Sequence, residues 1–187
     1  MRYFAAEENL RRFYHYYPGA VAVIGVEDPK NGANFMPAVW NMGLSFAPPL
    51  FGVAVSPKRR TYWLIERFRR YSVLFFPYRL TDLVARLGSV SGDAVNKVEA
   101  FGLEVHWGRA LKVPLLPGAY AAYELELADE VRTGDHTLFV GRVRGVWEDE
   151  QALDEEGVPT PERADPLLYY GYHLYGRAAP GLKRVKP

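Results

Sequence analysis

The chain has 187 residues, a net charge of +1 and no cysteine; 49% of its residues are apolar and 24% are charged. This near-neutral, ordinarily hydrophobic composition excludes a disordered protein, and the length predicts a single domain over residues 1–187. The absence of cysteine excludes disulfide scaffolds, iron–sulfur clusters, thiolate zinc sites and cysteine nucleophiles.

The N-terminal residues give no sign of a targeting signal. Charged side chains interrupt the segment Met1–Glu8, which argues against a secretory h-region. No later stretch reaches the roughly 18 apolar residues of a membrane span. We therefore expect a cytoplasmic protein that does not enter a membrane. Residues 5–16 predict a short amphipathic helix.

The first half of the chain predicts strands around one helix. Asn31-Gly32 favours a hairpin turn, because Asn and Gly tolerate positive φ. Ser56 or Thr61 is a candidate N-cap for a helix through residues 62–68, which ends in cations that suit a helix C-terminus. Apolar runs of strand length predict strands at residues 20–26, 35–45, 50–55 and 71–76.

The second half predicts two short helices followed by a long hairpin. Small residues at 88–92 form a turn between helical segments 81–87 and 93–101. Residues 119–131 alternate between apolar and polar positions, which predicts a half-buried strand paired with residues 137–147. The whole is mainly β with short helices. The acidic loop 148–165 has no predicted role.

Several common motifs are absent. The sequence has no G-x-G-x-x-G dinucleotide fingerprint and no P-loop. Gly88–Gly92 has the outline of a nucleophile elbow but carries Val90 where the serine would stand. The four histidines are far apart, with no pair at i and i+4, so we expect no metal site.

One ordered set of residues does carry a recognisable pattern. It begins with Asn34, Pro37, Trp40, Ser45 and Pro48-Pro49. Thr61 then stands at a helix start, Ser89 and Ser91 precede Lys97, and Gly134-Asp135-His136 precedes an apolar strand. In this order, over about residues 15–175, the sequence resembles the FMN-binding split-barrel family of flavin reductase-like and flavoredoxin-like proteins. The resemblance implies a mainly β fold, an FMN-binding split β-barrel with antiparallel Greek-key strands.

The resemblance also implies where FMN, or alternatively FAD, would bind. A phosphate needs N–H donors and cations, which a helix start beside Lys58, Arg59 and Arg60 supplies; the alternative is a solvated basic surface. Main-chain groups near Trp40 would meet the flavin ring, unless Trp40 is a core residue. The predicted cofactor-binding residues are Asn34, Val39, Trp40, Asn41, Met42, Ser45, Lys58, Arg59, Arg60, Thr61, Ser89, Ser91 and Lys97.

His136 is the predicted catalytic residue. Gly134 would turn the chain, and Asp135 could orient an imidazole that titrates near neutral pH beside the docked electron donor. The alternative is an ordinary surface histidine in a Gly-Asp turn. Hydride transfer to a flavin depends on positioning rather than on an acid–base pair, so we expect no catalytic dyad.

The sequence departs from the family pattern at three places. Val39 replaces the family's Ser or Thr before the Trp, so only main-chain groups can serve the ring there. Leu74 replaces an Asn, and Asn96-Lys97-Val98 replaces Asp-Lys-Phe. These changes weaken the assignment of the family's residue roles to this sequence more than they weaken the predicted fold.

We therefore predict a homodimer with flavin near the interface, acting as an NAD(P)H-dependent flavin reductase or in flavoredoxin-type electron transfer. An alternative is a non-enzymatic FMN-binding redox carrier. A third is a β-barrel nucleic-acid binder that uses the basic block 58–86 with Tyr62, Trp63, Phe68 and Tyr71. The net charge of +1 and the core-like spacing of Trp63, Leu64 and Phe68 argue against a nucleic-acid partner.

Overall fold

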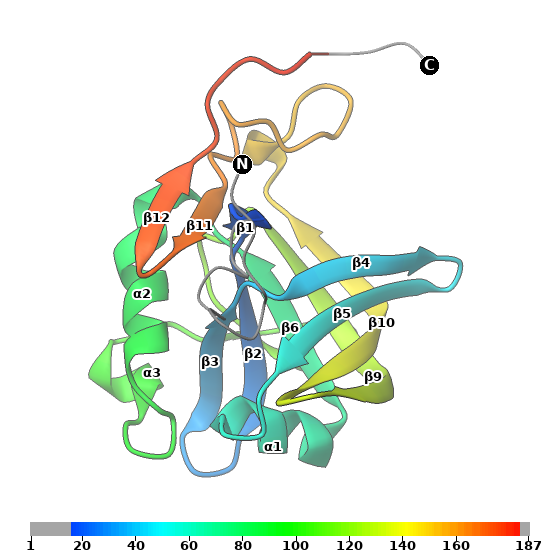
Figure 1. Cartoon of the computed structure of the whole chain (residues 1–187), viewed down its shortest axis with the longest axis vertical. Coiled ribbons are helices and arrows are strands. Elements are labelled where there is room, and N and C mark those ends of the chain that lie inside the picture. Colours follow the sequence, from blue (N-terminus) through cyan, green and yellow to red (C-terminus); the bar gives the residue numbers. More distant parts are fainter. Residues whose placement is uncertain (1–15, 184–187) are drawn as a thin grey trace, which may run out of the picture.

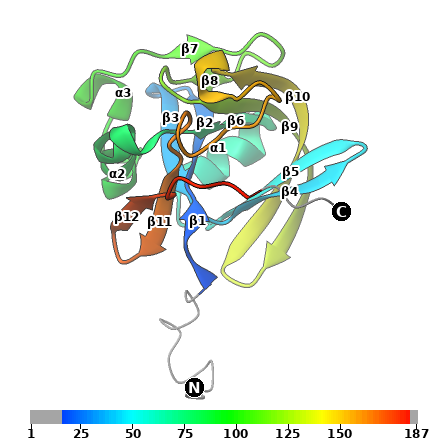
Figure 2. The same cartoon turned by 90° about the horizontal axis from the view of Figure 1, so that it is seen from above.

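The computed structural model describes residues 16–183. Within this range the chain is mainly β, as predicted, and is built on one seven-stranded antiparallel sheet with strand order β3-β2-β6-β9-β10-β5-β4 (Figures 1 and 2). The helix predicted over residues 5–16 lies, apart from Tyr16, outside the described residues. The strands of the large sheet are β2 (Ala22–Asp28), β3 (Gly32–Ala38), β4 (Asn41–Phe46), β5 (Pro49–Val55), β6 (Arg70–Phe75), β9 (Ala121–Thr133) and β10 (His136–Glu148).

Smaller elements surround this sheet. A three-stranded sheet has the order β1-β11-β12, and β7 pairs with β8. After the acidic loop, the chain forms β11 and β12. The remaining elements are β1 (Gly19–Ala20), β7 (His106–Trp107), β8 (Pro114–Leu115), β11 (Leu167–Gly171), β12 (Leu174–Arg177), α1 (Arg60–Phe68), α2 (Thr81–Ser89), α3 (Lys97–Ala100) and two 3₁₀ helices at Tyr78–Leu80 and Glu150–Ala152.

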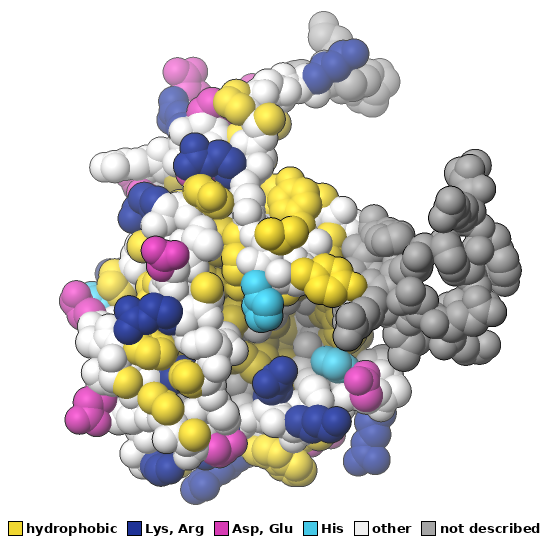
Figure 3. Space-filling view, turned by 60° about the vertical axis from the view of Figure 1, so that its left-hand side comes forward, with side chains coloured by type: hydrophobic (Ala, Val, Ile, Leu, Met, Phe, Trp, Pro, Cys, Tyr) yellow, Lys and Arg dark blue, Asp and Glu magenta, His cyan; other side chains and the backbone are white. Residues whose placement is uncertain are grey.

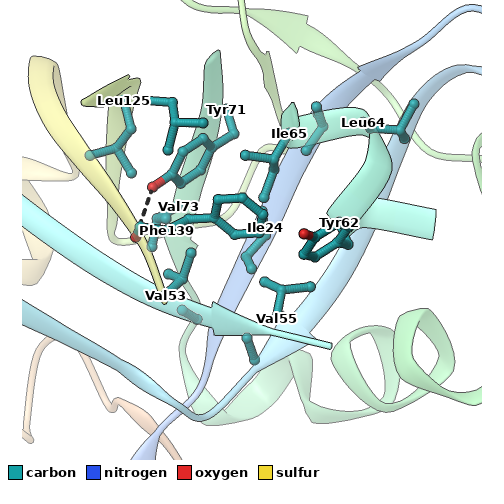
Figure 4. Packing of buried hydrophobic residues seen from close by; sticks show 14 of the residues in the cluster. Ile24, Val53, Val55, Tyr62, Leu64, Ile65, Tyr71, Val73, Leu125 and Phe139 are labelled. Atoms are coloured by element: carbon teal, nitrogen blue, oxygen red, sulfur yellow. Dashed lines mark hydrogen bonds between the residues drawn. The ribbon is translucent and has the colours of Figure 1, made fainter. Parts of the chain in front are cut away.

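The large sheet is curved around a hydrophobic core that α1 closes (Figure 4). Ile24, Val73 and Leu125 are fully buried there, and the Tyr71 hydroxyl donates to the Phe139 carbonyl at 3.5 Å. A second cluster lies on the other face of the sheet, where α2 and β11 contribute Leu87 and Leu167. Burying both faces explains why several strands read as continuous apolar runs.

The predicted arm over residues 35–45 is wrong in one respect, because it forms two strands. β3 ends at Ala38, and the Asn41 side chain then donates to the carbonyls of Ala38 and Val39 at 3.0 and 3.1 Å. These local bonds compete with the ladder and turn the chain. β4 therefore leaves the barrel and pairs with β5 in the projecting hairpin visible in Figure 1.

Both helix predictions around the cleft also need correction. Neither Ser56 nor Thr61 caps α1, because the N-cap residue is Arg59 and it makes no side-chain cap bond. The helix predicted over 93–101 is only the four residues of α3, because the Asn96 side chain accepts a hydrogen bond from the Glu99 N–H and starts the helix there.

The strand predicted over 119–131 is confirmed, but Glu124 on its polar face is not open to solvent. Glu124 is 1% exposed, and its carboxylate accepts N–H bonds from Arg109, Ala110 and Leu111 at 2.7–3.2 Å. Burial raises the pKa of Glu124, and these bonds with one from the Trp147 indole outweigh it, so the pKa is below its usual value. The carboxylate thus fastens the segment 109–111 onto the sheet.

Candidate functional site

A cleft of about 1050 Å³ opens between the large sheet and the β1-β11-β12 sheet. Figure 3 shows a hollowed face with hydrophobic side chains, histidines and Lys or Arg side chains gathered around it. Its volume lies just above the roughly 300–1,000 Å³ that is usual for small-molecule pockets. Of the predicted site residues, the cleft is lined by Asn34, Val39, Trp40, Lys58, Arg59, Arg60, Thr61, Ser89, Ser91, Lys97 and His136.

The start of α1 forms one end of the cleft. Its N-cap, Arg59, makes no capping bond, and its first turn contains no acidic residue. The Tyr62 N–H donates to the Arg59 carbonyl at 3.0 Å, which leaves the N–H groups of Arg60 and Thr61 for another acceptor. Thr61 is 1% exposed, and its hydroxyl accepts from the Asn34 amide at 2.8 Å. This end combines backbone donors and cations, which suits an anion.

Arg60 lines the cleft but is already engaged by carboxylates. Its guanidinium contacts Asp28 and Asp93, each at 2.6 Å. These bonds raise the pKa of Arg60 above its usual value; at Asp28, burial raises the pKa but the Arg60 bonds outweigh it, so the pKa is lowered. The ion pairs join the β2–β3 turn, α1 and the turn at 91–93. Arg60 thus supports the cleft wall, and its guanidinium is already paired with carboxylates rather than free for a phosphate.

Glycine is required where this wall is tightest. A Cβ at Gly92 would collide with the Asn34 side chain and come within 2.9 Å of the Arg60 Cδ atom. The Gly92 carbonyl accepts from the Asn31 amide at 3.0 Å, which fixes the same turn from the other side. The small-residue turn predicted from the sequence is therefore a close-packed part of the cleft.

Lys97 is a buried amine in the cleft wall. It is 3% exposed, and its Nζ donates to the carbonyls of Phe35 and Leu87 at 2.8 and 2.6 Å. Burial, and secondarily the charge of Arg59, lower the pKa of Lys97 to about 8. A negative group bound nearby would stabilise the charged amine and raise this pKa again.

Ser89 and Ser91 precede Lys97 in the sequence and also line the cleft. The Ser89 hydroxyl donates to the Arg86 carbonyl at 2.9 Å, and Ser91 contacts the Asp93 carboxylate at 3.3 Å. Their local bonds fit the turn predicted at 88–92, and both serines lie on the cleft wall.

The predicted ring-binding residues divide between two places. Val39 and Trp40 line the cleft, whereas Asn41, Met42 and Ser45 do not. The reason is the departure of β4 from the barrel: the Asn41 amide is bound to main-chain carbonyls, and Met42 is 56% exposed on the projecting hairpin. In this chain, then, the geometry leaves the last three residues outside the candidate site.

His136 lies in the cleft at the tip of the β9–β10 hairpin. Its Nδ1 atom is 2.7 Å from the Asp135 carboxylate, and its ring lies 4.5 Å from the Trp40 ring, centre to centre. The His136 hydrogen bond lowers the pKa of Asp135. The predicted pairing of these two side chains is therefore present, although Asp135 is exposed.

Sequence reasoning missed the wall formed by the small sheet. Tyr169 and Tyr175 come from β11 and β12, and the turn between these strands brings Tyr172 and His173 to the cleft. The sequence signal for this wall is the cluster of aromatic residues within 167–175. Its pairing with β1, at the other end of the chain, is what places it here.

The aromatic residues proposed for nucleic-acid stacking do not form one surface. Tyr62 and Tyr71 are buried in the core, at 6% and 0% exposure. The core position predicted for Trp63 is wrong, because this side chain is 59% exposed and its indole donates to the Pro57 carbonyl. No helix within residues 16–183 is long and apolar enough to cross a membrane. In the same residues, no group of three His, Asp or Glu side chains could hold a metal ion.

Solved structures similar to this chain include a crystal structure of an FMN-binding protein from Thermus thermophilus with bound 1-cyclohex-2-enone. It is 52% identical, covers 100% of both chains and has a TM-score of 0.88. A flavoredoxin from Methanosarcina acetivorans is 26% identical over 90% of this chain and 89% of its own, with a TM-score of 0.82.

An uncharacterized protein from Aeropyrum pernix is 34% identical over 83% of this chain, and the match spans only 58% of that relative's length. A putative flavin reductase with a split-barrel domain from Shewanella frigidimarina shares the fold, with a TM-score of 0.86 at 18% identity. The predicted split-barrel fold is thereby confirmed. Residues 13–177 match the family described as flavin reductase like domain, and the chain belongs to that family.

Proposed function

We propose that the cleft binds FMN, with its phosphate at the start of α1. The observation that carries the proposal is the convergence of an uncapped helix start with Lys58, Arg59 and the buried amine of Lys97 on one end of a 1050 Å³ cleft. A phosphate dianion would satisfy the first-turn N–H groups and offset these positive charges. The FMN-binding protein from Thermus thermophilus, 52% identical along the whole chain, supports FMN rather than FAD.

The ring of the cofactor would lie toward Val39 and Trp40. Val39 has no hydroxyl, so main-chain N–H and C=O groups there would meet the polar edge of the ring. A bound flavin supplies hydride and electron transfer. The chain's part is to hold the ring and exclude water, with the imidazole of His136 positioned by Asp135 beside Trp40.

The proposed activity is NAD(P)H-dependent flavin reduction or flavoredoxin-type electron transfer, and the chain's cytoplasmic location is part of the same proposal. A non-enzymatic FMN carrier with this fold is the second candidate. Anaerobic addition of NADH or NADPH to the FMN-loaded protein separates them. Loss of the oxidised flavin absorbance within the mixing time supports the enzyme, and an unchanged spectrum with both nucleotides supports the carrier.

We also propose that the protein is a homodimer in which a second copy covers the β4–β5 hairpin. Met42, Leu44 and Phe46 on this hairpin are 56%, 39% and 101% exposed. A run of exposed apolar side chains on a projecting arm indicates an interaction surface. The hairpin continues directly from Trp40 in the cleft, so a dimer contact there would lie close to the proposed flavin ring.

The phosphate assignment is tested by titrating the protein with FMN, with binding monitored by the quenching of flavin fluorescence. Arg59→Ala should weaken FMN binding about ten- to a hundredfold, because it removes one charge-assisted contact of about 1.5–3 kcal/mol. Arg67→Ala is the matched control, since Arg67 lies on the same helix but outside this cleft. Equal FMN affinity of the two variants would remove the phosphate from the start of α1.

A further inference from the structure

The wall of the cleft made by the small sheet differs chemically from the wall at α1. The residues that β11, β12 and their turn contribute to the lining are Tyr169, Gly171, Tyr172, His173 and Tyr175, without a Lys, Arg, Asp or Glu among them. The ring of Tyr169 packs at 5.1 Å from that of Tyr175 and at 5.8 Å from that of Tyr17. This end of the cleft therefore suits a flat, uncharged ligand, whereas the α1 end suits an anion.

His173 is an imidazole in this wall whose ring is not committed elsewhere. Within residues 16–183, the rings of His106 and His136 bond to carboxylates at 2.8 and 2.7 Å, while the ring of His173 has no hydrogen-bond or ion-pair partner. A neutral imidazole always carries one N–H donor. At the mouth of an aromatic cleft, that donor can bind an oxygen of the ligand.

The β11–β12 turn holds His173 in a backbone conformation that non-glycine residues rarely adopt. Tyr172 and His173 are the two central residues of the β11–β12 hairpin, with φ of 50° and 62°. Two-residue hairpin turns with positive φ at both positions usually contain Asn-Gly, because other residues are strained there. The Tyr169 hydroxyl accepts the His173 N–H at 3.2 Å and helps to fix the turn. Such strained positions concentrate at functional sites.

We propose that His173 and the tyrosines of the small sheet form the subsite for the second reactant, a planar ring compound with a carbonyl oxygen. The ring would lie among Tyr169 and Tyr175, and the His173 imidazole would donate to the carbonyl. The inference rests on the proposed FMN site, since it places the reactant in the remaining part of the same cleft. The uncharged wall argues against the pyrophosphate of a nicotinamide dinucleotide at this end.

The test uses p-hydroxybenzaldehyde, a planar ring carbonyl, titrated into the FMN-loaded protein and followed by the flavin difference spectrum. His173→Gly should raise the Kd of this probe about three- to tenfold, the worth of one neutral hydrogen bond. The variant should fold at least as well as the wild type, because glycine adopts the required φ without strain. His173→Asn tolerates the same turn and keeps a donor, so it should recover part of the affinity.

His106→Ala is the matched control, because His106 is exposed, bonds to Glu104 and does not line the cleft. Equal probe affinities for His173→Gly and His106→Ala would overturn the inference, as would the absence of saturable binding of the probe to the wild type. The FMN titration is read separately. If FMN itself does not bind, the proposed function fails, and the probe titrated against the flavin-free protein by tyrosine and tryptophan fluorescence still decides the role of His173.

Discussion

The buried amine of Lys97 predicts that FMN binding weakens as the pH rises above neutrality. The pKa of Lys97 is about 8, because burial and the nearby Arg59 disfavour its charged form. If a bound phosphate holds the amine fully protonated, the affinity for FMN falls tenfold for each unit of pH above this pKa. Between about pH 7 and 9 the protonated fraction of the free protein falls from about nine-tenths to one-tenth, so the Kd for FMN should rise about tenfold.

The stability of the flavin-free protein should change in the opposite direction over the same range. The pKa of Lys97 in the folded chain lies below the value near 10.5 of an unfolded chain. The unfolded chain therefore binds more protons between these values, and the free energy of unfolding rises with pH there. FMN titrations and urea unfolding at pH 7, 8 and 9 measure both trends on the wild-type protein.

Lys97→Met provides the matched variant, because it keeps most of the apolar stem and removes the titrating amine. It should bind FMN more weakly at neutral pH and show a nearly flat dependence of Kd on pH. A wild-type Kd that stays constant from pH 7 to 9 would refute the reasoning, because it would mean that the phosphate does not interact with Lys97. A rise that persists unchanged in Lys97→Met would assign the titration to another group.

Three further predictions concern the scaffold around the site. Glu124→Gln should lower the free energy of unfolding in urea by about 2–4 kcal/mol, since it weakens several charge-assisted bonds, whereas the exposed Glu126→Gln should cost less than about 1 kcal/mol. Gly92→Ala should weaken FMN binding severalfold in the fluorescence titration, because its Cβ displaces Asn34. Phe46→Glu should shift the protein to the monomer mass in light scattering at micromolar concentration; an unchanged dimer mass would exclude the β4–β5 hairpin as the interface.

Local sequence patterns predicted the hairpins well because each depends on neighbours in the chain. The Asn31-Gly32 turn and the alternation along β9 are examples, and both are present. The break between β3 and β4 was not predicted, because it depends on which carbonyls the Asn41 amide reaches in the folded chain. The burial of Glu124 was missed for a similar reason: its partners at 109–111 and Trp147 are brought together only by tertiary structure.

The candidate site shows the same division. The family resemblance gave residues on β3, α1 and α3 that the fold does bring to one cleft, including Asn34, Thr61 and Lys97. It gave no site residue on the wall formed by the small sheet, because the aromatic residues near position 170 reach the cleft through pairing of β11 with β1. From the sequence alone, these residues are recognisable only as an aromatic cluster without an assigned role.

The three consecutive cations at 58–60 show why charge along the sequence is a poor guide to charge in space. Arg60, the first residue of α1, points to Asp28 and Asp93 and is neutralised by them. Arg59 precedes the helix and lies close enough to Lys97 to lower the pKa of that amine. Lys58 lies near Asp135, whose pKa it helps to lower. A block that reads as one basic patch is thus divided: Arg60 belongs to structural ion pairs, whereas Lys58 and Arg59 line the cleft where we propose the phosphate. Two cations at one cleft favour a small anion over a nucleic-acid strand.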